Sequence, residues 1–184
     1  MYILSKLWLK IYQDIFNGFH EPKRASSSSS STHRLTYEVF LSFRGEDTRN
    51  SFTSHLYTAL DQKGIYTFID DEKLERGKSI SSKLMKAIKE SRFAIVILSK
   101  NYASSTWCLE ELEEIIGCIN KTRMTILPIF YYVDSSDVRK QIGTFKQAFD
   151  EHEQCFKENI EKVQKWSAIL KEVANILGWH LPKR

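Results

Sequence analysis

The residues best suited to chemistry are a carboxylate and an aromatic side chain four positions apart. Trp107 and Glu111 lie in the segment 106–120, where apolar residues recur every three to four positions and predict a helix. This spacing places both side chains on one side of the first turns. A carboxylate beside an aromatic ring can stabilise the positive charge that develops when a glycosidic bond breaks through an oxocarbenium-like state. Acidic runs on helices are also typical of solvated faces, so the spacing leaves both interpretations open.

Motifs for several other kinds of chemistry are missing from the sequence. Neither G-x-x-x-x-G-K-[ST] nor G-x-G-x-x-G occurs, which excludes the P-loop and the Rossmann nucleotide turn. The third apolar run ends in Ser99-Lys100, whereas a phospho-acceptor receiver needs an aspartate there. No G-x-S-x-G elbow supports acyl transfer. The three cysteines lack C-x-x-C spacing, so neither a disulfide framework nor a metal site is predicted, and we interpret Cys108 as a buried structural thiol.

Short apolar runs alternate with amphipathic segments along most of the chain. The runs rich in β-branched and aromatic residues are 37–43, 65–69, 93–98 and 125–133, and the helical segments are 51–63, 80–90, 106–120, 144–157 and 159–177. This alternation predicts an α/β fold with a parallel sheet of four to five strands and helices on both faces. Only a short edge strand fits after Gly178, so the final helix of a repeating β/α scheme is missing from this sequence and one face or edge is expected to be underpacked.

Ligands of open parallel sheets bind beyond the carboxyl ends of the strands. Four polar loops with charges of both signs fall there: 44–49, 70–78, 99–105 and 134–137.

The first 36 residues differ in composition from the rest. Residues 1–20 have apolar side chains at helical spacing and predict an amphipathic helix. This helix either docks on a membrane surface or partner, packs on the domain, or is a leader without a role in the fold. The serine run makes 21–36 a flexible linker. Five basic and two acidic side chains lie in 1–36, which leaves 22 basic and 21 acidic ones in 37–184. This nearly neutral balance argues against nucleic-acid binding.

Taken together, the motifs resemble a plant Toll/interleukin-receptor (TIR) domain over residues 37–181. The resemblance rests on YEVFLSFRGEDTR at 37–49, the segment 70–80, NYA at 101–103, WCLEEL at 107–112, PIFY at 128–131 and GW at 178–179. It implies a flavodoxin-like three-layer fold.

The resemblance also implies an activity. Plant TIR domains self-associate and cleave NAD+ at the nicotinamide glycosidic bond, releasing ADP-ribose or cyclic ADP-ribose in immune and cell-death signalling. It places the catalytic glutamate at Glu111, nucleotide contacts at Arg44 and Arg49, and a substrate-packing ring at Trp107. NAD+ is then a substrate, and no prosthetic group or metal is expected.

Two surfaces are assigned by the same resemblance. The mobile loop contains Asp70, Asp71, Arg76 and Gly77, and the self-association residues are Ser54, His55, Gly178 and Trp179. The expected partners are further copies of the chain or other TIR domains. The expected location is the cytoplasm, with nuclear or membrane-associated pools left open. The alternative function is a catalytically silent TIR adaptor or truncated fragment that only binds other TIR domains.

Overall fold

A five-stranded parallel sheet forms the centre of the protein. The computed structural model describes residues 10–13, 15, 35–70, 81–122 and 124–182. The strands are β1 (Tyr37–Phe43), β2 (Thr67–Ile69), β3 (Ser91–Leu98), β4 (Thr125–Tyr131) and β5 (Trp179–Leu181). Their order is β2-β1-β3-β4-β5, and every neighbouring pair is parallel. This confirms the α/β prediction and its edge strand.

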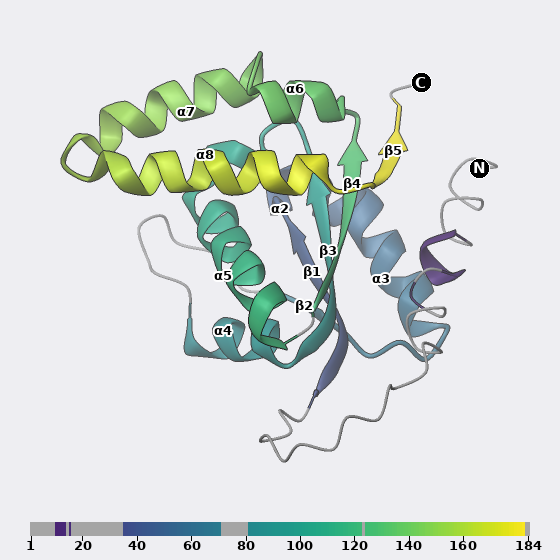
Figure 1. The fold of residues 1–184 in the computed structure, drawn as a ribbon. Helices are drawn as coiled ribbons and strands as arrows, with labels where there is room; N and C mark the ends of the chain where they lie inside the picture. The colour runs from purple at the N-terminus through teal and green to yellow at the C-terminus, as the bar shows by residue number, and fades with distance from the viewer. Residues whose placement is uncertain (1–9, 14, 16–34, 71–80, 123, 183–184) are drawn as a thin grey trace.

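Helices cover both faces of the sheet (Figure 1). The segments α2 (Gly45–Thr48), the π-helical η1 (Arg49–Thr53) and α3 (Ser54–Asp61) follow β1. On the opposite face lie α4 (Ser82–Lys89), α5 (Thr106–Thr122) and α8 (Ile160–Asn175), with α6 (Ser135–Lys140) and α7 (Thr144–Cys155) beside α8. Short 3₁₀ turns, η2 (Tyr102–Ser104) and η3 (Lys157–Asn159), precede α5 and α8.

Two short helices lie where the sequence predicted loops, at α2 and α6. In α6 only Val138 is buried, so the segment has no apolar periodicity to reveal it. The carboxylate of Asp134 caps α6 by accepting a hydrogen bond from the backbone N–H of Ser136 at 2.7 Å. Strand β4 also ends earlier than predicted, at Tyr131, because Tyr132 adopts φ 56° and leaves the extended conformation.

The alternation of side chains along each strand creates two apolar clusters, one on each face of the sheet. Phe40, Val96 and Phe130 pack with α4, α5 and α8. Leu41, Ile95 and other odd-numbered residues of β1, β3 and β4 face α3. Both faces of the central strands are therefore apolar, as a covered parallel sheet requires.

The amino-terminal helical segment packs on the α3 face of the sheet. Ile11 and Ile15 have exposed fractions of 1% and 0% and belong to the same apolar cluster as α3. The Lys63 ammonium lies 5.5 Å from the centre of the Tyr12 ring. Figure 1 shows this segment beside α3. The described residues of the segment 1–20 pack on the domain, as one of the alternatives predicted. Residues 21–34 of the predicted linker lie outside the described part of the chain, whereas the backbone N–H of Thr36, at its end, donates to the Glu90 carbonyl oxygen at 2.9 Å.

A second element is needed on this face for a geometrical reason. Five strands about 4.8 Å apart span roughly 19 Å, whereas one helix is about 10 Å across. Helix α3 alone therefore cannot cover the sheet, and among the described residues no helix follows β5. Ile11 and Ile15 pack beside α3 on this face. The amino-terminal segment therefore covers part of the face that the sequence predicted to be underpacked.

Replacing one of these isoleucines should destabilise the domain. We expect Ile15→Ala to lower the free energy of unfolding by about 2 kcal/mol, because it removes buried methyl groups and leaves a cavity. Gln13→Ala alters an exposed residue of the same segment and should change stability by less than about 0.5 kcal/mol. Urea unfolding of the full chain measures both. Equal stability of the two variants would contradict this packing.

The entry to β5 requires a glycine. A Cβ added to Gly178 would lie 2.5 Å from the carbonyl oxygen of Pro128 and 2.9 Å from Cε2 of Phe130. The edge strand can therefore approach β4 only because position 178 has no side chain.

A pair of glycine substitutions tests this close approach. Gly178→Ala should cost about 1–3 kcal/mol of stability because the clash is with backbone. Gly117→Ala on α5, where an added Cβ meets no atom within 4 Å, should instead stabilise the protein by about 0.5–1 kcal/mol through helix propensity. Thermal unfolding should show melting temperatures that move in opposite directions, and a Gly178→Ala protein as stable as wild type would refute the clash.

Candidate functional site

Arg44 leaves the carboxyl end of β1 and lies between two carboxylates. Its Nη2 donates to Glu46 Oε2 at 2.5 Å, and its Nε lies 3.8 Å from Asp47 Oδ1. The Arg44 side chain is 17% exposed, whereas that of Glu46 is 75% exposed. Its Nε has no hydrogen-bond partner among the described residues. The guanidinium of Arg44 is thus held by a close ion pair with the exposed Glu46 and by a longer one with Asp47.

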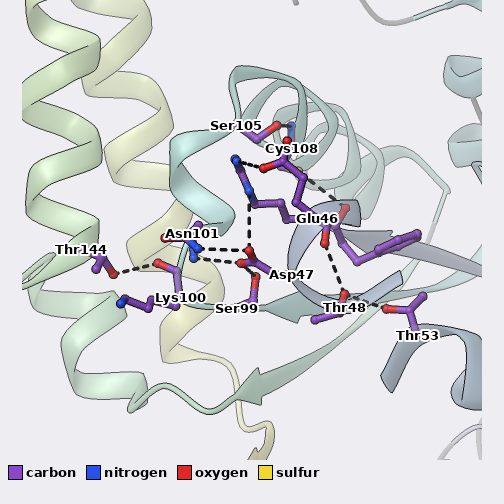
Figure 2. A network of polar contacts seen from close by, with 12 residues as sticks. Glu46, Asp47, Thr48, Thr53, Ser99, Lys100, Asn101, Ser105, Cys108 and Thr144 are labelled. Carbon is purple, nitrogen blue, oxygen red and sulfur yellow. Dashed lines mark hydrogen bonds and ion pairs between the residues drawn. The ribbon is translucent and has the colours of Figure 1, made fainter. Parts of the chain in front are cut away.

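Asp47 ties the loop after β1 to the loop after β3 (Figure 2). Its Oδ2 accepts hydrogen bonds from Ser99 Oγ at 2.6 Å and from the Asn101 backbone N–H at 3.0 Å, and its Oδ1 accepts from Asn101 Nδ2 at 3.1 Å. One carboxylate therefore satisfies three donors that lie more than fifty residues away in sequence. No local pattern in the sequence indicates this role for Asp47, because its partners are more than fifty residues away.

Arg49 folds back over the same loop. Its guanidinium carbon lies 5.0 Å from the centre of the Phe43 ring. A Cβ on Gly45 would lie 3.2 Å from Arg49 Nε, so the glycine gives the side chain room to pass. The two arginines expected to contact a nucleotide thus begin from one short segment at the carboxyl end of β1.

Glu111 is a buried carboxyl on α5, with an exposed fraction of 5%. Burial away from water raises its pKa from an ordinary 4.5 to about 8. The Ser42 hydroxyl opposes this increase in pKa, the charge of Asp70 adds to it, and the nearby Trp107 indole opposes it. Glu111 Oε1 and Trp107 Nε1 are buried and make no well-formed hydrogen bond with described residues. At neutral pH Glu111 therefore carries a proton in this state.

Cys108 belongs to the packing around this carboxyl. It is 4% exposed, and its thiol lies 3.6 Å from the Phe43 carbonyl oxygen, to which it donates. Burial, followed by the charge of Glu111, raises the pKa of Cys108 to about 12. A thiol held neutral in this way is a poor nucleophile, which confirms the interpretation of Cys108 as structural.

The structure separates the remaining predicted residues into different places. Asp70 lies beyond β2 and acts on Glu111 through its charge, whereas Asp71, Arg76 and Gly77 lie outside the described residues.

Ser54 and His55 are exposed on α3, across the sheet from Glu111. They line a groove of about 410 Å³ together with Thr58, Ala59 and Gln62. Gly178 and Trp179 are at the edge of the sheet. The Glu111 site and the predicted self-association residues are thus spatially distinct.

These features coincide with a known family. The chain matches the TIR domain family over residues 36–183 and belongs to it. It is 55% identical over 152 residues to TMV resistance protein N of Nicotiana glutinosa and 52% identical over 161 residues to disease resistance protein RPV1 of Vitis rotundifolia. These alignments cover 83% and 86% of this chain but only 13% and 11% of those relatives.

A solved structure gives the same result. The TIR domains of the activated Roq1 resistosome, which directly recognises the pathogen effector XopQ, are 56% identical with a TM-score of 0.75. The match covers 79% of this chain and 88% of that one. Within the described residues, no helix combines the length and the hydropathy needed to cross a membrane.

The buried carboxyl predicts a specific pH dependence of stability. The native Glu111 holds a proton that the unfolded chain releases between about pH 4.5 and pH 8, so stability should fall as the pH rises through this interval. Glu111→Gln removes the titration, and wild type should lose about 2–4 kcal/mol more than this variant across the interval. Urea unfolding at a series of pH values measures the difference.

The control for this experiment is Glu114→Gln, which removes a carboxylate three residues further along α5. It should keep the wild-type pH dependence. Parallel profiles for wild type and Glu111→Gln would contradict a protonated, buried Glu111.

Proposed function

We propose that this TIR domain cleaves the nicotinamide glycosidic bond of NAD+ and releases ADP-ribose or its cyclic form. The observation that supports the proposal most is the buried Glu111 beside Trp107, at the carboxyl end of the sheet. A carboxylate in such a poorly solvated place interacts strongly with developing positive charge. Cleavage of a nicotinamide glycoside creates that charge on the ribose as the oxocarbenium-like state forms.

Glu111 acts in its ionised form in this proposal. It stabilises the oxocarbenium-like transition state or orients the attacking hydroxyl, and both roles need a carboxylate. Because its pKa is about 8, the ionised fraction increases across the neutral range. The rate of nicotinamide release should therefore increase with pH up to about pH 8.

Arg44 and Arg49 hold the pyrophosphate, and Trp107 packs against the substrate. A guanidinium matches phosphate oxygens with two parallel N–H groups. Arg44 must first give up its pair with Glu46, and exposed pairs of this kind contribute at most about 1 kcal/mol. A doubly charged pyrophosphate can compete with such a partner.

Self-association completes the site. Glu111 is only 5% exposed, so NAD+ reaches it only after the surrounding side chains rearrange. We infer that contacts between copies, through Ser54 and His55 on α3 and the Gly178-Trp179 edge, drive this rearrangement. Similarity to plant disease resistance proteins and to the TIR domains of a resistosome supports a role in plant immune and cell-death signalling in the cytoplasm.

Nicotinamide release from NAD+ tests the proposal. The specific activity of the folded full chain should increase with protein concentration, because assembly precedes turnover. Glu111→Ala should lower activity by about 100-fold or more, as expected for loss of a charge-stabilising group. Glu114→Gln, on the same helix, should keep activity within about twofold.

Two outcomes would contradict the enzyme interpretation. Constant specific activity on dilution would refute the dependence on assembly. No release from folded wild type at any concentration would favour the adaptor, which only binds other TIR domains.

A further inference from the structure

The Asp47 carboxylate holds the segment that leads from β3 into α5. Its side chain is 13% exposed, and its two oxygens accept three hydrogen bonds from Ser99 and Asn101, at 2.6, 3.0 and 3.1 Å. Asn101 immediately precedes η2, which leads into α5. Since Glu111 is on α5, Asp47 is bonded to the approach of the helix that carries the proposed catalytic carboxyl.

Hydrogen bonds from α7 hold the same segment from another side. The Thr144 hydroxyl donates to the Lys100 carbonyl oxygen at 2.7 Å (Figure 2). The buried His152 donates through Nε2 to the Ala103 carbonyl oxygen at 2.8 Å. The segment between β3 and α5 is therefore fixed by α7 as well as by Asp47, and the position of the Asp47 carboxylate is fixed in turn.

The same carboxylate faces Arg44. Asp47 Oδ1 lies 3.8 Å from Arg44 Nε, which is buried and has no hydrogen-bond partner among the described residues. Glu46 pairs instead with Nη2, at the tip of the guanidinium, and is 75% exposed. Exposed ion pairs contribute little to stability, so a phosphate can replace Glu46. Asp47 stays in place as a fixed negative charge beside Nε.

The substrate sets a demand on this geometry. NAD+ contains its pyrophosphate and its nicotinamide glycosidic bond in one molecule, so the groups that bind them must lie at matching positions. Binding free energy gained at the pyrophosphate orients the reacting bond only if these two parts of the site keep their relative geometry.

We propose that Asp47 is a positioning residue that fixes Arg44 relative to the start of α5, and thereby relative to Glu111. Asp47 acts through Arg44 and does not touch the substrate. The catalytic consequence rests on the proposed function, whereas the positioning of Arg44 by Asp47 does not.

Asp47→Asn separates the two contacts of this carboxylate. The carboxamide oxygen replaces Oδ2 and still accepts from Ser99 Oγ and the Asn101 backbone N–H, so the segment before α5 keeps these two bonds. The carboxamide NH2 replaces Oδ1 and faces Arg44 Nε, where two donors cannot pair and the negative charge is lost. The variant should therefore fold, while Arg44 loses its fixed position.

Nitrogen-15 NMR of the Arg44 Nε–H group in the full chain tests the positioning directly. The signal is assigned by its loss in Arg44→Lys, and its hydrogen should exchange slowly with water in wild type because Nε is buried. Asp47→Asn should accelerate this exchange by about tenfold or more. The matched control is Glu46→Gln, which removes the exposed partner of the same guanidinium and should change the exchange by less than about threefold. Equal exchange in wild type and folded Asp47→Asn would overturn the proposal.

A double-mutant cycle on nicotinamide release tests the catalytic consequence. Asp47→Asn should lower kcat/KM for NAD+ by about tenfold when Arg44 is present, but by less than about twofold in Arg44→Ala, because Asp47 acts through Arg44. The control is Thr144→Ala, which removes a hydrogen bond to the same segment from α7 and should have equal effects in both backgrounds. Equal effects of Asp47→Asn in both backgrounds would show a merely structural role and overturn the catalytic consequence.

The outcomes separate this proposal from the proposed function. If folded wild type releases no nicotinamide, the proposed function fails, and exchange of the Arg44 Nε–H still decides whether Asp47 positions it. If nicotinamide is released but exchange in Asp47→Asn equals that of wild type, the positioning fails and the proposed function stands.

A second variant decides if Asp47→Asn does not fold. Ser99→Ala removes the donor that lies 2.6 Å from Asp47 Oδ2 and keeps the charge of the carboxylate. It should accelerate exchange of the Arg44 Nε–H by about threefold or more, because Asp47 is held less firmly. Unchanged exchange in folded Ser99→Ala would then overturn the proposal.

Discussion

The parallel pairing of β1 with β3 at the centre of the sheet is the constraint on which the site depends. This register aligns Phe43 with Ile97, so the loops that follow β1 and β3 begin at the same end of the sheet, beyond the carboxyl ends of its strands. The three donors on Ser99 and Asn101 then meet the Asp47 carboxylate. A shift of the pairing by one residue would turn every side chain to the opposite face and separate these loops. The position of Arg44 and the first turns of α5 follow from the same alignment.

The two faces of the sheet are covered by different elements and bury different groups. The face covered by α4, α5 and α8 is dense enough to bury a carboxyl and two hydroxyls, and this burial gives Glu111 its unusual pKa. Buried polar groups are costly unless they find partners, and Ser42 and Tyr102 satisfy each other. On the α3 face, Ile11 and Ile15 of the amino-terminal segment join the apolar cluster that α3 covers.

This division has a functional consequence. Glu111, the proposed catalytic residue, is on α5 on one side of the sheet, whereas α3, with the exposed Ser54 and His55, is on the other. The segments η1 and α3 continue directly from the loop that contains Arg44, so one continuous stretch of chain joins this loop to the proposed self-association surface. The amino-terminal segment packs against the same side as α3, so it belongs to the surroundings of that surface.

The sequence by itself determined the elements and the candidate residues. Periodicity located the five helical segments, strand composition located the sheet, and the spacing of Trp107 and Glu111 indicated a glycosidic site, because each depends on neighbours within a few positions. Motif resemblance fixed the family. The predicted loops at α2 and α6 were wrong, since helices of four and six residues have too few buried positions to produce a pattern.

Only the tertiary structure decided the state of the site. The bridge from Asp47 to Ser99 and Asn101, the raised pKa of Glu111 and the contact between Ser42 and Tyr102 were not readable in advance. Asp47 meets Asn101 across 54 positions and Ser42 meets Tyr102 across 60. A sequence pattern reports local spacing, whereas desolvation and hydrogen bonding depend on which distant segments the fold brings into contact.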